Sequence, residues 1–170
     1  MKLISVIDRA KYYAISLHGS QTYGGLPYFY HLEAVVSILE EFGFTDYRYQ
    51  IVGYLHDVLE DCPVSFNDIK ESFGEEIAES VYCITDELGR NRKERKAKTL
   101  PKLVTNRVAI IVKLADRIAN IRHAGKMFEV YKKEHLAFKD ALYSSFKEPG
   151  IHSMWNEIEI LLNVKQTKYE

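Results

Sequence analysis

Apolar residues recur at intervals of three and four along almost the whole chain, and this spacing limits the folds that the chain can adopt. The runs from Ile4 to Leu17 and from Val35 to Phe42 are two examples. A period of three to four places apolar side chains on one face of an α-helix, whereas a half-buried strand alternates with a period of two. The sequence contains no alternating pattern of this kind. It therefore predicts an all-α fold.

Glycine and proline residues mark the places where the expected helices begin and end, as such residues commonly do. They lie at Gly43, Pro63, Gly74, Gly89 and Pro149. The only long turn-rich stretch of the first half is residues 18–27. The helices expected between these breaks cover residues 3–17, 30–42, 47–60, 66–72, 75–86, 91–100, 105–124, 127–145 and 151–163.

The length of 170 residues suits one domain with one hydrophobic core. Hydrophobic residues make up 46% of the chain and charged residues 28%, which is the balance of a globular rather than a disordered protein. We therefore expect a single compact bundle of about eight to ten helices over residues 1–170. Residues 18–124 form its expected functional core, and helices within residues 127–163 pack against that core.

Two cysteines, Cys62 and Cys83, have neither the spacing of a metal finger nor the number of a disulfide framework. The N-terminal segment carries charges every few residues, so it lacks the apolar run of a signal peptide or membrane span. We expect a cytoplasmic chain that does not associate with membranes. The apolar stripe around Trp155 either completes the core, which is the first expectation, or forms a homodimer interface.

Charge is distributed unevenly along the chain. Residues 1–89 hold 5 basic and 15 acidic side chains, and residues 90–170 hold 18 and 9. Such a split marks either an acidic metal site that faces a basic substrate-binding wall, or two halves that attract each other on packing. The segment 90–102 alone has seven basic side chains and one acidic one. It could attract a phosphorylated substrate or only be solvated, and no nucleic-acid-binding motif accompanies it.

The segment YLHDVLED, residues 54–61, gathers four ionisable side chains on one expected helix. His56 and Asp57 are adjacent, and Glu60 and Asp61 follow one turn later. Because residues four apart share a helix face, the spacing predicts that His56 lies under Glu60 and Asp57 under Asp61. Four polar groups are thus expected at one end of this helix.

Imidazole and carboxylate groups together suit a divalent transition-metal ion, and further ligands would come from other helices. Two candidates stand out. His31 begins a helix directly after the turn-rich stretch, and Asp116 lies among apolar residues in VKLADRIANIR.

A structural role is the alternative for each of these residues taken singly. His56 and Asp57 would then form a surface pair, and Asp116 would pair with Arg117 or Lys113. A histidine–aspartate dipeptide is only two residues long, so it indicates a metal site only together with the longer pattern around it.

The longer pattern resembles the RelA/SpoT-type branch of the HD superfamily of metal-dependent phosphohydrolases. The resemblance runs in order from HGSQ at His18 through GLPYFYH and YLHDVLED to KLADRIANIR, and covers about 100 residues. It implies that the nearest relatives are small, stand-alone (p)ppGpp hydrolases without a synthetase domain. It also implies one Mn²⁺ ion, held by His31, His56, Asp57 and Asp116.

The resemblance also implies how such a site would work. Two carboxylates neutralise the ion, and open coordination positions remain for a water of lowered pKa and a phosphoryl oxygen. The family's acidic pair matches Glu60 and Asp61, which would orient the attacking water and accept its proton. Acidic groups at a helix C-terminus oppose the helix dipole, so a nearby cation would explain their position.

Three further residues are expected to contact the substrate. Asn120 lies one turn after Asp116 and matches an asparagine that contacts the nucleotide in the family. Arg122 belongs to the same signature, and it either supports the site electrostatically or is solvated on a polar helix face. Tyr23 replaces an arginine that grips the guanine base in relatives. An aromatic ring can stack on a base, but it lacks the charge and hydrogen bonds of a guanidinium.

Removal of the 3′-pyrophosphate from (p)ppGpp is the leading hypothesis, with pyrophosphate and GDP or GTP as products. Tyr23 leaves open the hydrolysis of another nucleotide, such as NADPH or a nucleoside monophosphate. A third hypothesis is a nucleotide sensor without turnover, which would predict damage to the ligands or to the acidic pair, yet all six residues are present. Each hypothesis implies a small-molecule nucleotide and no nucleic acid.

Overall fold

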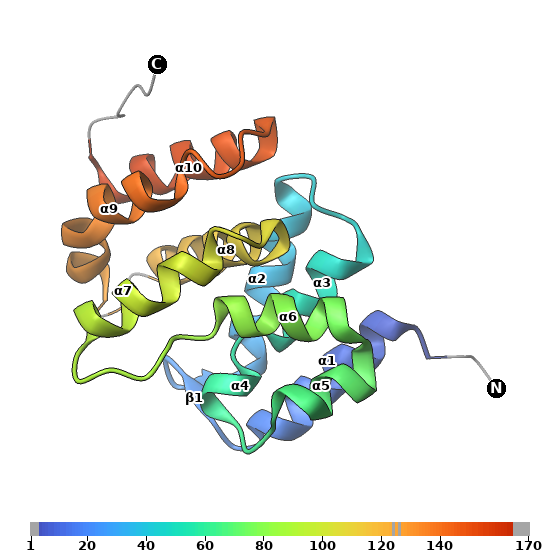
Figure 1. Ribbon diagram of the computed structural model, residues 1–170. Helices are drawn as coiled ribbons and strands as arrows, with labels where there is room; N and C mark the ends of the chain where they lie inside the picture. Colours follow the sequence, from blue (N-terminus) through green and yellow to red (C-terminus); the bar gives the residue numbers. More distant parts are fainter. Residues whose placement is uncertain (1–3, 124, 126, 165–170) are drawn as a thin grey trace.

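The computed structural model describes residues 4–123, 125 and 127–164, so the expected helix ends at residues 3 and 124 lie outside the described residues. Over the described range the chain forms helices and one short hairpin, which confirms the all-α prediction (Figure 1). The helices are α1 (Val6–His18), α2 (Phe29–Glu41), α3 (Tyr47–Leu55), α4 (Val58–Asp61), α5 (Phe66–Phe73), α6 (Glu75–Ile84), α7 (Arg92–Leu103), α8 (Arg107–Arg122), α9 (Phe128–Leu142) and α10 (Pro149–Leu162).

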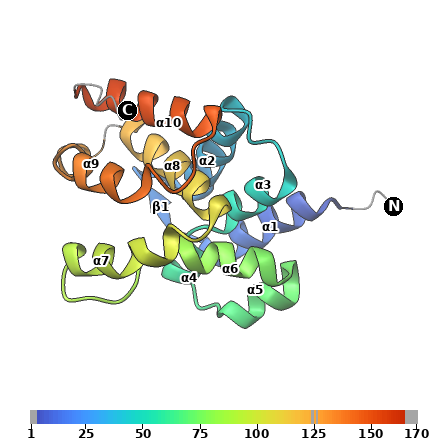
Figure 2. The same cartoon turned by 45° about the horizontal axis from the view of Figure 1, so that its top comes forward.

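Helix α8 lies at the centre of the molecule, and α2, α3, α6 and α10 pack against it (Figures 1 and 2). Its apolar residues, among them Leu114 and Ile118, are fully buried because neighbours cover it on several sides. Asp116 and Arg117, in the same stretch, are buried as well. Since buried charged groups are costly unless they are paired, their presence on the most enclosed helix points to a site there.

The contact between α2 and α3 is unusually close because α3 carries Gly53. A Cβ at this position would lie 3.1 Å from a methyl carbon of Leu39 and 3.1 Å from one of Val36, so any larger residue would push the helices apart. The close approach sets the C-terminal end of α3 beside the first turn of α2. It thereby brings His56, which follows α3, next to His31.

The prediction of one continuous helix over residues 47–60 is wrong, because the helix is interrupted near its C-terminal end. Helix α3 ends at Leu55 and α4 begins at Val58, so His56 and Asp57 occupy a turn. Consecutive residues of an α-helix point about 100° apart, which would separate the two side chains. The turn instead brings His56 Nε2 within 2.9 Å of Asp57 Oδ2. Both residues keep right-handed helical backbone angles, and the Asp61 N–H donates to the Asp57 carbonyl oxygen, so the predicted stacking of the two pairs stays a prediction.

The stretch 18–27 contains a short hairpin that the sequence pattern did not predict. Strands β1 (Thr22–Tyr23) and β2 (Leu26–Pro27) pair antiparallel, with Tyr23 opposite Leu26. The turn between them is made of Gly24 and Gly25, whose positive φ angles of 57° and 85° favour glycine. Two-residue strands are too short for alternation to be visible in a sequence.

The remaining differences from the predicted helices lie at element ends. Helix α7 continues through Pro101 to Leu103, and α10 begins at Pro149, in the first turn, where proline needs no hydrogen-bond partner. Trp155 of α10 is 1% exposed, so the stripe around it belongs to the core as first expected. Homodimer formation stays a prediction. Within the described residues, no helix is both long enough and apolar enough to span a bilayer.

Candidate metal centre and substrate pocket

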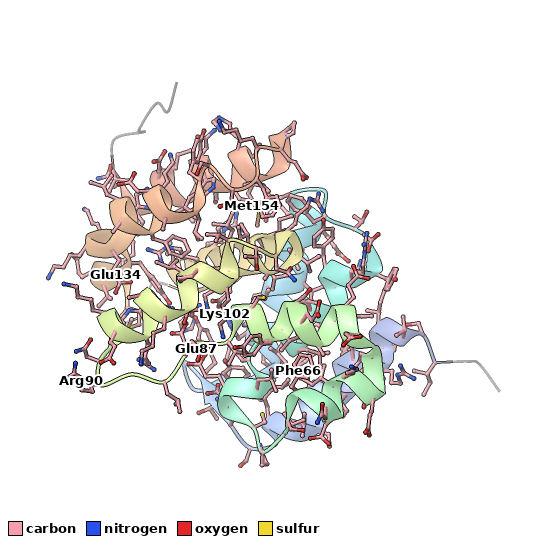
Figure 3. All side chains as sticks on the ribbon, in the orientation of Figure 1. Phe66, Glu87, Arg90, Lys102, Glu134 and Met154 are labelled. Atoms are coloured by element: carbon pink, nitrogen blue, oxygen red, sulfur yellow. The ribbon has the colours of Figure 1, made fainter. Side chains whose placement is uncertain are left out.

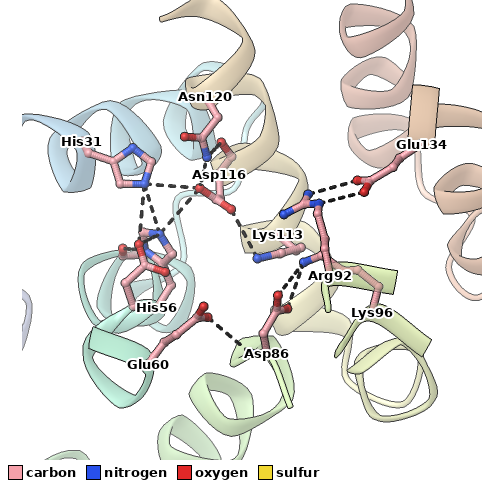
Figure 4. Close-up of polar contacts among 12 residues, drawn as sticks. His31, His56, Glu60, Asp86, Arg92, Lys96, Lys113, Asp116, Asn120 and Glu134 are labelled. Carbon is pink, nitrogen blue, oxygen red and sulfur yellow. Dashed lines mark hydrogen bonds and ion pairs between the residues drawn. The ribbon is translucent and has the colours of Figure 1, made fainter. Parts of the chain in front are cut away.

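Two imidazole rings and two carboxylates meet in the interior, between α2, the turn after α3, and α8 (Figure 4). The Nε2 atoms of His31 and His56 lie 3.3 Å apart. Asp116 Oδ1 lies 3.2 Å and 3.7 Å from these two atoms, respectively. Asp57 Oδ2 lies 3.8 Å from the first and 2.9 Å from the second. The structure therefore brings together the four residues that were predicted as metal ligands.

A backbone contact orients the ring of His56 toward this cluster. Its Nδ1 atom lies 2.8 Å from the carbonyl oxygen of Gly53. Since a carbonyl oxygen only accepts, Nδ1 carries a proton, and Nε2 faces the cluster. Histidine ligands of metal ions commonly have their second nitrogen held in this way.

The charges of the cluster suit a bound cation. Burial by itself lowers the pKa of His56, but the negative charges of Asp57 and Asp116 raise it to about 10. Burial raises the pKa of Asp116, whereas the charge of Lys113 and bonds from the two histidines take it below its usual range. The carboxylates thus stay ionised and retain a proton on the imidazole. Two imidazole nitrogens and two carboxylate oxygens are a donor set that fits a divalent transition-metal ion in place of that proton.

Tyr28 holds one of the two carboxylates. It directly precedes α2, and its hydroxyl donates a hydrogen bond to Asp57 Oδ2. Burial, followed by the charge of Asp57, raises the pKa of the phenol, so the hydroxyl remains a donor. Its ring stacks on His18, with ring centroids 4.3 Å apart. His18, at the start of the turn-rich stretch, thus contacts the tyrosine that binds Asp57.

A pocket of about 150 Å³ opens beside the cluster. Helices α7 and α8 contribute its cationic side chains, and α9 closes it with Tyr131 and Phe138. Three of the cations have acidic partners (Figure 4). Lys96 lies 2.9 Å from Asp86, Arg92 makes two hydrogen bonds to Glu134 of α9, and Lys113 lies 3.4 Å from Asp116. The cationic side chains that line the pocket are Arg92, Lys96, Lys113 and Arg117.

The two acidic residues of α4 have different surroundings. Glu60 lines the pocket, and its Oε2 accepts a hydrogen bond from the backbone N–H of Asp86. Burial, and then the charge of Asp86, raises the pKa of Glu60. Asp61, an exposed residue like Glu60, is not part of the pocket lining and accepts a hydrogen bond of 3.0 Å from Gln21. Only Glu60 is placed to exchange a proton with a group inside the pocket.

The HD-domain family model matches residues 10–143 of the chain. The chain belongs to the HD-domain family. The dipeptide that gives the family its name is His56–Asp57, at the turn between α3 and α4. A divalent metal at this position is what the fold of an HD domain implies, and the cluster described above fits it.

Curated relatives of this HD domain are named as (p)ppGpp enzymes. The chain is 33% identical over 167 residues to the bifunctional (p)ppGpp synthase/hydrolase SpoT of Escherichia coli K12, an alignment that covers 93% of this chain and 24% of that protein. It is 32% identical over 160 residues to the guanosine-3′,5′-bis(diphosphate) 3′-pyrophosphohydrolase of Aquifex aeolicus, with coverage of 90% and 23%. The chain thus spans about a quarter of the length of these relatives.

Solved structures show the same fold as this HD domain. One, described as a metazoan ortholog of SpoT that hydrolyses ppGpp, superposes with a TM-score of 0.73 at 23% identity and covers 94% of this chain and 97% of that one. A protein of Listeria monocytogenes EGD-e superposes with a TM-score of 0.61 at 24% identity, covering 81% and 99%. Both likenesses concern the fold.

The predicted substrate-contacting residues of the HD domain divide into two groups. Tyr23 and Asn120 line the pocket beside the cluster, and burial is the main cause that raises the pKa of the Tyr23 hydroxyl to about 12. Arg122 does not line it. Its guanidinium binds both carboxylate oxygens of Glu41 on α2 and one of Glu157 on α10. The structure thus places Arg122 as a tie between helices.

Sequence reasoning missed several residues of the site. Tyr28 lies in the GLPYFYH segment but was not singled out, although a polar aromatic directly before the helix of a predicted ligand was an available signal. Lys113 was named only as an alternative ion-pair partner of Asp116, and its Nζ indeed lies 3.4 Å from that carboxylate while also facing the pocket. Asp86 follows α6 without any pattern that marks it.

Proposed function

We propose that this HD domain removes the 3′-pyrophosphate of (p)ppGpp, with one Mn²⁺ ion held by the four-residue cluster. The observation that carries the proposal is the adjacency of the cluster to a pocket lined by four cationic side chains. The same lining holds the four carboxylates Asp57, Glu60, Asp86 and Asp116, which a bound metal ion would partly neutralise, so that the cations could hold the pyrophosphate groups at the 3′ and 5′ positions of a guanosine. The names of the relatives, aligned over more than nine-tenths of the chain, support the same substrate.

In the proposed hydrolysis, the cluster would hold the metal ion and Glu60 would act as the general base. When bound, Mn²⁺ would act as a Lewis acid and lower the pKa of a water. His31, His56, Asp57 and Asp116 would hold it. The oxygen of a water would bond to the phosphorus attached to the 3′ oxygen while Glu60 takes a proton from that water, and the bond from phosphorus to the 3′ oxygen would break. The 3′ oxygen would take up a proton, from Glu60 or from solvent, to give the 3′ hydroxyl, and pyrophosphate would leave.

The cationic side chains of the pocket would bind the phosphate groups of the substrate. Lys113 and Arg117 reach the pocket from α8, and Arg92 and Lys96 reach it from α7. Charge-assisted hydrogen bonds from these groups would hold the leaving pyrophosphate and the 5′ phosphates. They also explain how the basic segment 90–102 contributes, since two of its side chains face the pocket while Lys98 and Lys102 pair with acidic neighbours outside it.

Hydrolysis of a different nucleotide is the second candidate, and Tyr23 favours it. A tyrosine offers no guanidinium to a guanine base, and its hydroxyl is already bonded within the protein. The same metal and the same water would then act on another phosphate ester.

A substrate panel distinguishes these candidates. Purified chain is incubated with ppGpp, GTP, AMP or NADPH in the presence of Mn²⁺ or of a chelator, and the products are separated by ion-exchange chromatography. We expect GDP and pyrophosphate from ppGpp, only with metal. Metal-dependent turnover of NADPH or AMP in preference to ppGpp would replace the proposed substrate, and tight binding without turnover of any of them would favour a sensor.

A further inference from the structure

A chain of hydrogen bonds connects Tyr23 to the candidate metal centre. The Tyr23 hydroxyl donates to Asn120 Oδ1 at 2.8 Å. Asn120 Nδ2 in turn donates to Asp116 Oδ1 at 2.6 Å and to the Asp116 carbonyl oxygen at 2.9 Å. Asp116 Oδ1 is the oxygen that faces both imidazoles of the cluster. One side chain of the hairpin is therefore linked through one amide to the buried carboxylate (Figure 4 shows the second link).

The direction of these bonds fixes the amide. If Asn120 turned over, its Oδ1 would face the carboxylate oxygen, and two acceptors would meet. The hydroxyl of Tyr23 supplies the donor that Oδ1 requires in the observed orientation. The bond from Tyr23 thus holds the amide in the one orientation in which it can donate to Asp116.

The ring of Tyr23 is also in contact with neighbouring side chains. It stacks on His31 with centroids 4.6 Å apart and planes 30° apart, and it contacts the ring of His123 at 4.5 Å. Gly24 permits this arrangement, because a Cβ there would lie 2.2 Å from His123 Nε2. To stack on a nucleobase, Tyr23 would have to leave these contacts.

We propose that Tyr23 is a positioning residue of the metal centre, which orients Asp116 through Asn120 and braces the imidazole of His31 with its ring. The proposal rests on the proposed function for the presence of a metal-dependent reaction, but it assigns Tyr23 a task other than gripping the base. Selectivity for guanine does not come from this position. Loss of the Tyr23 hydroxyl weakens metal binding and slows turnover without weakening substrate binding.

A double-mutant cycle on metal affinity tests this. Mn²⁺ binding is measured by titration calorimetry, without nucleotide, for wild type, Tyr23→Phe, Asn120→Ala and the double variant. Tyr12→Phe, an exposed tyrosine on α1, is the matched control. Loss of a residue that hydrogen-bonds a metal ligand typically lowers metal affinity by about 10–100-fold. We expect about a tenfold loss for Tyr23→Phe in the wild-type background and no further loss in the Asn120→Ala background, with Asn120→Ser as a second background.

The outcomes separate this inference from the proposed function. An unchanged affinity in Tyr23→Phe, or an equal loss in both backgrounds, overturns the positioning role whatever the substrate is. With whichever nucleotide the enzyme hydrolyses as substrate, Tyr23→Phe should lower kcat at saturating Mn²⁺ and leave KM within twofold of the wild-type value. A raised KM with unchanged kcat would return Tyr23 to substrate binding. If the wild type did not hydrolyse ppGpp, the proposed substrate would be wrong. The double-mutant cycle on Mn²⁺ affinity would still show whether Tyr23 positions Asp116 through Asn120.

Discussion

Glu60 and Asp61 are adjacent acids on one short helix, yet only the first faces the pocket. We expect Glu60→Gln to lower kcat by about 10²–10⁴-fold, the usual contribution of a positioned general base. Asp61→Asn should cost much less, because Asp61 does not line the pocket and its carboxylate is bonded to Gln21. Steady-state pyrophosphate release at saturating Mn²⁺ measures both. Equal losses in the two variants would contradict the assignment.

The pH profile offers a separate prediction for Glu60. Burial raises the pKa of this carboxyl above the ordinary value of 4.5, so it gains a proton at a higher pH than an exposed glutamate would. A general base works only when it is deprotonated. At saturating metal, kcat should therefore fall as the pH decreases through this raised pKa, and Glu60→Gln should lack this acidic limb. A variant that keeps the limb would show that another group titrates.

At the residue scale, the sequence predicted which side chains would lie together but little of their surroundings. His31, His56, Asp57 and Asp116 were singled out as candidate ligands because residue type, order and spacing together form a long pattern, and the structure brings these four side chains together. The difference between Glu60 and Asp61 could not be predicted, because it depends on where α6 leaves the backbone N–H of Asp86. The role of Arg122 was equally hidden, since its partners lie on α2 and α10.

Helix α7 supplies cations to the pocket, and two arginines near its start make a matched pair. Arg92 lines the pocket, while the side chain of Arg90 is 91% exposed and lies at the rim of the molecule (Figure 3). A hydrogen bond to a charged group contributes about 1.5–3 kcal/mol, so we expect Arg92→Gln to raise KM for ppGpp by about 10–100-fold. Arg90→Gln should leave KM unchanged. A similar rise in both would indicate general electrostatic attraction instead.

Helices α2, α8 and α10 are tied together by Arg122. Its bonds to Glu41 and Glu157 are partly exposed, and pairs of this kind typically contribute about 0.2–1 kcal/mol each. We expect Arg122→Gln to lower the free energy of unfolding by about 1 kcal/mol and to leave KM and kcat unchanged. Urea denaturation and steady-state kinetics test this together. An unchanged stability with a raised KM would restore a substrate role.

At the element scale, periodicity and helix breakers predicted most helices closely, because each amphipathic segment satisfies its own backbone and shows its buried face in sequence. The interruption at His56–Asp57 was not visible. No glycine or proline marks it, and both of its side chains belong to the cluster. The hairpin before α2 was missed for the opposite reason, since turn residues were plain but the strands were too short to show a pattern.

Binding of the metal ion should raise the thermal stability of the whole molecule. A ligand that binds only the folded state at about 100 times its Kd adds about 2.7 kcal/mol to stability, which in a chain of this size raises Tm by roughly 5–10 °C. We expect Mn²⁺ to produce such a rise in wild type and in Glu79→Ala, an exposed carboxylate on α6. Asp116→Ala should show none. Differential scanning calorimetry with and without chelator measures the shifts, and an equal rise in Asp116→Ala would place the metal elsewhere.

At the scale of the whole chain, the helical content followed from the apolar pattern, whereas the central position of α8 and the packing that creates the pocket did not. The charge asymmetry of the sequence left two interpretations open. The structure combines them, because Lys96 of the basic half pairs with Asp86 of the acidic half and also lines the pocket beside the acidic cluster.

Pyrophosphate release from ppGpp as a function of Mn²⁺ concentration, in wild type, Asp57→Ala and Glu79→Ala, tests the central claim most directly. The account predicts saturable, Mn²⁺-dependent release in wild type and Glu79→Ala, and loss of release in Asp57→Ala at every metal concentration. Release that persists in Asp57→Ala, or that does not depend on metal in wild type, would contradict a hydrolytic centre built on His31, His56, Asp57 and Asp116.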